Sequence, residues 1–168
     1  METVAALALG IVVFMQGLQI LDLSAAKTSG IIGAAGAIVL IALMALKPLP
    51  LLLAGGSLSA FSTSMLVWAL YATLVAAVGL WGFDARGLGY FSAYGAIAML
   101  LQVLYCIVTK TSPIGIICGI TQFIAFAMLF FYLALPMKGL KKATAWVLAA
   151  AGVIHGVLGA LILWQVPV

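Results

Sequence analysis

The sequence predicts an all-α membrane protein with six transmembrane helices, and three observations carry this prediction. The chain has 168 residues, of which 67% are hydrophobic and only 6% are charged. A soluble domain has roughly 45–50% apolar and about 25% charged residues. The apolar residues form six long stretches, and the charged residues lie at the ends of these stretches. A soluble fold could not cover so much apolar surface, and a disordered chain would contain far less of it.

Each apolar stretch is long enough to cross a bilayer. A spanning helix needs about 20 mostly apolar residues, because hydrocarbon offers no partner to an open backbone group. The expected spans within a single transmembrane domain, residues 1–168, are 4–21, 28–46, 58–81, 88–109, 113–135 and 142–165.

Local chemistry predicts where these segments begin and end. The first ends at Asp22 and the second at Lys47-Pro48, where proline removes a backbone donor. The fourth ends ahead of Lys110, and the fifth begins at Ser112-Pro113, which suits an N-cap and a first helical turn. Because no Lys or Arg precedes Lys27, the first segment lacks the basic start of a signal peptide and is expected to be retained.

The basic residues predict the orientation in the membrane. Connections after the first, third and fifth segments hold five Lys or Arg residues, whereas those after the second and fourth hold only Lys47 and Lys110. By the positive-inside rule the first group is cytoplasmic, so both termini are expected outside the cytoplasm of a bacterial inner membrane. Aromatic residues fall near the predicted interfaces with lipid headgroups: Trp81, Tyr90, Trp146 and Trp164.

Two segments one hairpin apart resemble each other. Gly17-Leu18 followed by Asp22 recurs as Gly79-Leu80 followed by Asp84, each ahead of a basic residue. An internal repeat would make the protein three helical hairpins, as in many transporters; the alternative is that helix ends commonly collect Gly, Asp and Lys. Small residues also mark expected helix contacts in lipid, at Gly30, Gly33, Gly36, Gly115, Gly119, Gly152, Gly156 and Gly159.

The composition argues against an enzyme. The chain has one His, three acids and two Cys, and every acid lies at the end of an expected helix. A zinc site needs three or four ligands together, and a Ser-His-Asp triad needs an acid beside the His. Neither a phosphate-binding loop nor a basic run for nucleic acid is present. We therefore expect no catalytic residues, metal, cofactor or nucleic-acid partner.

Polar residues within the spans are few and uncharged, which favours passive movement of a small neutral solute over ion or proton coupling. They are Gln16, Thr63, Ser64, Tyr71, Thr73, Gln102, Thr121, Gln122 and His155. On the fifth segment Phe123, Phe126 and Phe130 share a helical face beside Leu129. Such a stripe lines a solute path or packs against lipid and core. His155 likewise either bonds to a neighbouring helix or lines a pore.

The order of motifs resembles the AmiS/UreI family of urea and short-chain amide channels. Gln16-Gly17-Leu18 with Lys27, the segment Gly82-Phe83-Asp84-Ala85-Arg86, and Thr144-Ala145-Trp146 with Gly152-Val153-Ile154 follow the spacing of that family. The resemblance implies three hairpins around a channel in each protomer, protomers in a hexameric ring, and passive conduction of urea or acetamide-like amides between aromatic constrictions.

The resemblance also implies positions along the channel. Phe123, Phe126 and Phe130 occupy positions where the family has Trp. The family's aromatic residue on the third helix matches Trp68, with Tyr71 or Ala72 near its second position. Pore positions of the first helix match Ala6, Leu9 and Val13, of which Leu9 and Val13 are expected to form that side of the channel. Leu129 and His155 complete the expected pore-lining set. Ala151 replaces a family Glu, and the expected outer connections lack His and acids, so a channel that acid does not gate is expected.

Two other functions compete with this interpretation. A membrane scaffold or assembly subunit would use the small residues for packing and would have a dry interior. A membrane enzyme built on His155 would need a second reactive group at membrane depth, and the sequence offers no acid there.

Overall fold

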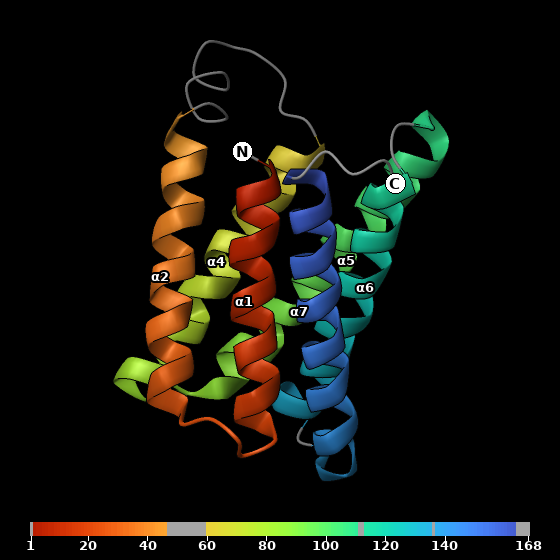
Figure 1. Cartoon of the computed structure of the whole chain (residues 1–168). Coiled ribbons are helices and arrows are strands. Elements are labelled where there is room, and N and C mark those ends of the chain that lie inside the picture. Colours follow the sequence, from red (N-terminus) through yellow and green to blue (C-terminus); the bar gives the residue numbers. More distant parts are fainter. Residues whose placement is uncertain (1, 47–59, 111–112, 136, 164–168) are drawn as a thin grey trace.

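The computed structural model describes residues 2–46, 60–110, 113–135 and 137–163, and all regular structure within these ranges is helical (Figure 1). Each long helix overlaps one expected segment. These helices are α1 (Glu2–Ile20), α2 (Ala26–Leu46), α4 (Ala60–Trp81), α5 (Ala85–Thr109), α6 (Pro113–Leu129) and α7 (Lys141–Leu163). A π-helical turn, η1 (Phe130–Ala134), continues α6, and a 3₁₀ helix, η2 (Lys138–Leu140), leads into α7.

The helices close into a ring in chain order, because α7 packs back against α1 (Figure 1). The most extensive contacts join α1 to α7, α2 to α4, and α5 to α6. The three predicted hairpins would instead pair α1 with α2, α4 with α5, and α6 with α7. These pairs also touch, but less extensively, so the tight pairs are offset by one helix and the hairpin arrangement is not confirmed.

Glycines allow the tight pairs to approach each other. A Cβ on Gly152 of α7 would lie 2.5 Å from the backbone nitrogen of Phe14 and 2.7 Å from the carbonyl oxygen of Gly10, both on α1. A Cβ on Gly79 of α4 would lie 2.7 Å from the Cα of Gly30 on α2. No larger residue fits these contacts without separating the helices, and small residues are what helix pairs in lipid use.

Four described segments are long and apolar enough to cross a membrane by length and composition: Ala26–Leu46, Ser64–Trp81, Ala85–Thr109 and Gly115–Ala134. Val4–Ile20 is apolar but shorter. The protein is therefore a multi-pass helical membrane protein, while six crossings stay a prediction. The expected stop at Lys47-Pro48 and the interface residue Trp164 lie outside the described residues.

The two Asp residues of the resembling segments act differently. The side chain of Asp84 accepts a hydrogen bond of 2.9 Å from the backbone N–H of Arg86 and caps α5. Asp22 follows α1 with a φ of 62° and accepts a hydrogen bond of 2.6 Å from the Nζ of Lys141. That hydrogen bond raises the pKa of the Lys141 ammonium. Asp22 thus ties α1 to the start of α7, and the resemblance between the segments does not extend to their contacts.

Candidate functional site

A narrow cavity lies inside the ring between α1, α4, α6 and α7. Its volume, measured as the space open to the centre of a water-sized sphere, is about 10 Å³. This is about the least volume that one water molecule needs. The cavity is lined by Leu9, Val13, Tyr71, Gln122, Ala125, Phe126, Leu129, Leu148, Ala151 and His155. Six of the nine residues expected to line a pore are therefore brought together, namely Leu9, Val13, Tyr71, Phe126, Leu129 and His155.

A chain of hydrogen bonds crosses the wall of this cavity from α4 through α6 to α7. The indole Nε1 of Trp68 donates to the Oε1 of Gln122 at 2.5 Å. The Nε2 of Gln122 lies 2.9 Å from the Nε2 of His155. The Nδ1 of His155 lies 2.8 Å from the carbonyl oxygen of Ala151, one turn earlier on α7. Gln122 and His155 are 4% and 1% exposed, so these bonds are made away from water.

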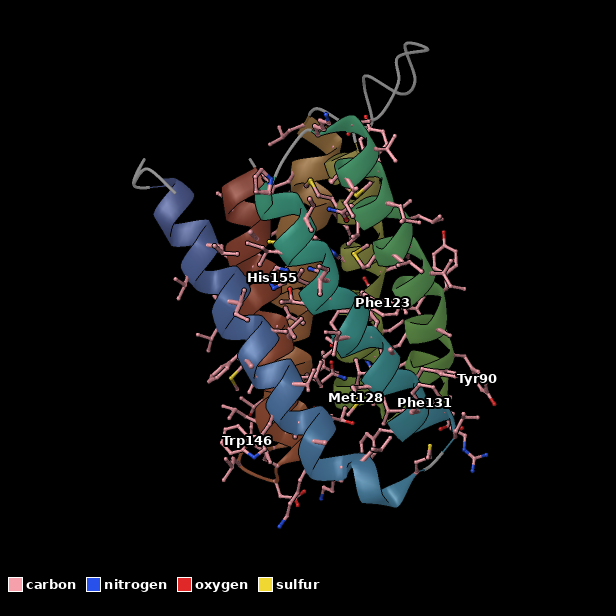
Figure 2. All side chains as sticks on the ribbon, turned by 90° about the vertical axis from the view of Figure 1, so that its right-hand side faces the viewer. Tyr90, Phe123, Met128, Phe131, Trp146 and His155 are labelled. Atoms are coloured by element: carbon pink, nitrogen blue, oxygen red, sulfur yellow. The ribbon has the colours of Figure 1, made fainter. Side chains whose placement is uncertain are left out.

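The expected aromatic stripe of α6 is divided between the cavity and the packing around it. Phe126 lines the cavity and meets the ring of Tyr71 edge-on at 5.2 Å. Phe123 is partly buried against the hydrophobic core, and Figure 2 shows it on the side of α6 away from His155. Phe130 lies in η1 and packs against the ring of Phe131 at 5.3 Å.

Helical geometry explains this division. The cavity-facing residues of α6 are Gln122, Ala125, Phe126 and Leu129, at i, i+3, i+4 and i+7. Each residue of an α-helix is turned by roughly 100° from its predecessor. Phe123 follows Gln122 and Phe130 follows Leu129, so both point about one such step away from the centre of the lining face. Of the three Phe residues in the expected stripe, Phe126 alone lines this cavity.

Trp68 was expected to form a wall but lies behind one. Its side chain is 2% exposed and is not among the lining residues. It meets the ring of His155 edge-on at 6.5 Å and holds Gln122 by the hydrogen bond described above. Trp68 therefore acts on the cavity only indirectly, through its hydrogen bond to Gln122.

A second cavity lies between α1, α4, α5 and η1, nearer to the end of α1 than the first cavity. It has about 50 Å³ for the centre of a water-sized sphere and is lined by Gln16, Gln19, Ile20, Val75, Val78, Ala85, Leu88 and Leu133. The hydroxyl of Tyr71 donates a hydrogen bond to the Oε1 of Gln16. Because Tyr71 lines the first cavity and Gln16 the second, this hydrogen bond stands between the two spaces.

Helix α4 supplies donors to three glutamines on three other helices. Ser64, Trp68 and Tyr71 are spaced i, i+4 and i+7, so they share one face. Their donors reach Gln102 of α5, Gln122 of α6 and Gln16 of α1, respectively. Every buried polar side-chain atom of the described residues has a hydrogen-bond partner.

Sequence reasoning noted Gln16 and Gln122 as polar residues within spans but did not place them at the site. Their signal was an amide within an apolar run, beside Gly17 and Phe123, respectively. The small and aliphatic lining residues Ala125 and Leu148 were not expected, because they carry no such signal. Ala151 was named along the channel only through the resemblance, as the replacement of a family Glu. Among the described residues, no three His, Cys, Asp or Glu side chains come together as metal ligands, and Cys106 and Cys118 are both free thiols.

Residues 1–166 match the family model described as the AmiS/UreI family transporter. The chain belongs to the AmiS/UreI family. It is thus a member of a transporter family and not an enzyme. Among solved structures, its fold is similar to a cryo-EM structure of the Helicobacter pylori urea channel in the closed state, with a TM-score of 0.74 and 19% sequence identity over 100% of both chains. No curated protein matches the sequence.

Proposed function

We propose that the protein is a passive channel for urea or short-chain aliphatic amides. The observation that carries this proposal is the cavity between α1, α4, α6 and α7, which has aromatic and aliphatic walls, no charged lining residue, and the hydrogen-bonding groups of Tyr71, Gln122 and His155. Membership of the AmiS/UreI family and a fold similar to that of a urea channel support it.

The chemistry of the walls suits a small, planar, neutral solute. Phe126, Leu129 and Leu9 offer apolar surfaces to its faces, while a few polar groups replace some of the hydrogen bonds that it leaves in water. Conduction requires that such binding be weak enough for release. The lining includes no Asp, Glu, Lys or Arg, the charged residues that ion- and proton-coupled carriers usually hold within the membrane.

Further parts of the proposal concern orientation, assembly and gating. The distribution of basic residues favours both termini outside the cytoplasm of a bacterial inner membrane, and family membership favours a homohexamer in membrane lipid. The expected outer connections carry neither His nor acid besides Glu2, so we expect similar uptake at neutral and acid pH. Steep activation by acid would contradict the absence of acid gating.

The test is uptake of labelled urea and acetamide into vesicles containing the purified protein. Phe126→Ala removes part of the cavity wall and is expected to change the uptake rate. Phe131→Ala is the matched control, because Phe131 is 42% exposed and does not line the cavity. Uptake by the unmodified protein equal to that of empty lipid vesicles would reject the channel.

The alternative is a membrane scaffold without a conducting path. Two cavities at successive levels of α1 and α4 favour the channel over the scaffold. Single cysteines along the cavity face of α6, with Ala125→Cys as the first, would react with a small water-soluble thiol reagent in a channel. A scaffold with a dry interior would protect them.

A further inference from the structure

The orientation of the Gln122 amide follows from its two neighbours. An indole N–H is only a donor, so the group that faces Trp68 at 2.5 Å must be the Gln122 oxygen. On the other side, the carbonyl of Ala151 is only an acceptor, so the Nδ1 of His155 carries a hydrogen toward it. In a neutral ring this leaves the Nε2 of His155 as an acceptor for the Gln122 N–H. Both neighbours therefore select the same amide orientation.

This arrangement leaves one N–H group of Gln122 for the cavity that Gln122 lines. A carboxamide has two N–H donors, and His155 accepts one of them. Within the described part of the chain, no residue accepts the other. On the α4 side of the same cavity, the Tyr71 hydroxyl donates to Gln16, so its oxygen keeps lone pairs that can accept.

We propose that Gln122 is the carbonyl-recognising donor of this channel, held in that orientation by Trp68 and His155, with the Tyr71 oxygen as acceptor for a solute N–H. The inference rests on the proposed function and names the groups that read the solute. A solute with both a carbonyl oxygen and an N–H group, as in urea and primary amides, satisfies both positions. A hydroxyl oxygen can also accept from the Gln122 N–H, but we expect it to be a weaker acceptor than a urea or amide carbonyl, so a neutral solute without a carbonyl gains less from Gln122.

Solute selectivity tests the role of Gln122. The measured quantity is the ratio of urea uptake to ethylene glycol uptake in vesicles, since ethylene glycol is a small neutral solute with hydroxyls but no carbonyl. Gln122→Met keeps the length of the side chain and removes the donor. We expect it to lower the ratio by about twofold or more, because urea loses the stronger of the two hydrogen bonds to Gln122 and ethylene glycol the weaker one.

Gln102→Met is the matched control. Gln102 is also a buried glutamine that accepts a hydrogen bond from α4, through Ser64, but it lines neither cavity. Its replacement is expected to leave the ratio unchanged, even where total uptake falls. An unchanged ratio in Gln122→Met, or an equal fall in both variants, would overturn the inference. Failure of the unmodified protein to pass urea would reject the proposed function, and the inference with it.

Trp68 and His155 are positioning residues in this proposal, and a measurement on the unmodified protein tests them. His155 is the only histidine in the chain, so its ring nitrogens can be observed by ¹⁵N NMR without ambiguity. We expect the hydrogen on Nδ1 and a bare Nε2 at neutral pH. A hydrogen on Nε2 would contradict the proposed orientation of Gln122, because the Gln122 amide would then have to turn its oxygen toward His155. Trp68→Phe keeps an aromatic ring in place but removes the indole N–H that holds Gln122. We expect it to lower the ratio of urea uptake to ethylene glycol uptake.

Discussion

The contact between α1 and α7 gives a sharp prediction about two glycines of one helix. Gly152 and Gly156 lie one turn apart on α7, and the sequence pattern treats them alike as small residues for packing. In the structure their environments differ. A Cβ on Gly152 would lie 2.5 Å from the backbone nitrogen and 2.6 Å from the Cβ of Phe14, whereas a Cβ on Gly156 would meet nothing within 4 Å.

The magnitude follows from these distances. Non-bonded carbon atoms pack best at about 3.5–4.0 Å, so alanine at position 152 requires α1 and α7 to separate by about 1 Å. The obstructing atoms are largely backbone, which no change of rotamer can move. Overpacking of this kind costs about 1–3 kcal/mol. Alanine also gains about 1 kcal/mol over glycine from helix propensity, and this gain is shared by Gly152→Ala and Gly156→Ala.

The difference between the two variants therefore isolates the packing cost. We expect Gly156→Ala to be as stable as the unmodified protein or more so, and Gly152→Ala to be less stable than Gly156→Ala by about 1–3 kcal/mol. Unfolding of the purified protein in detergent, followed by circular dichroism, measures this difference. Equal stability of the two variants would refute the close approach of α1 and α7.

Three further predictions concern the cavities and the helix ends. Leu129→Ala should widen the first cavity and increase uptake of butyramide relative to acetamide, at a cost of about 2–5 kcal/mol in the free energy of unfolding; an unchanged ratio would contradict the cavity. Tyr71→Phe should destabilise the protein by about 1–3 kcal/mol, since the buried Gln16 loses its donor, as measured by unfolding. The pKa of Lys141 is raised by its hydrogen bond to Asp22, so the pair stabilises the protein at neutral pH and loses this effect as pH rises through the raised pKa. The melting temperature of Asp22→Asn should therefore lie below that of the unmodified protein at neutral pH and converge with it in strongly alkaline buffer.

Hydropathy predicted the helices because a membrane requires long apolar segments whatever their neighbours are. Within the described residues, the six long helices lie within a few residues of the expected segments. The pairing of helices could not be predicted in the same way, because it depends on which small residues face each other across the bundle. Gly30 meets Gly79, and Gly10 meets Gly152, and nothing in the local sequence of any of these glycines specifies its partner.

The residues around the cavity could likewise be expected only in part, because some of them depend on contacts between helices. Apolar walls can be inferred from periodicity and resemblance, as for Leu9 and Phe126, but hydrogen-bond partners on different helices cannot. Gln122 and Phe123 are adjacent in the sequence, and the choice of which one faces the cavity depends on the rotation of α6. That rotation places the amide between Trp68 and His155 and turns Phe123 toward other packing.

In the proposed channel, the three donors on one face of α4 contribute both to the stability of the bundle and to the choice of solute. Ser64, Trp68 and Tyr71 each tie a glutamine of another helix, so the polar groups within the ring are held by neutral partners. An ion entering such a cavity would lose its hydration and find no opposite charge, which is strongly unfavourable. A neutral amide loses only hydrogen bonds, and the groups that could replace them are already oriented. The network that orders the helices therefore also favours a neutral, hydrogen-bonding solute over an ion.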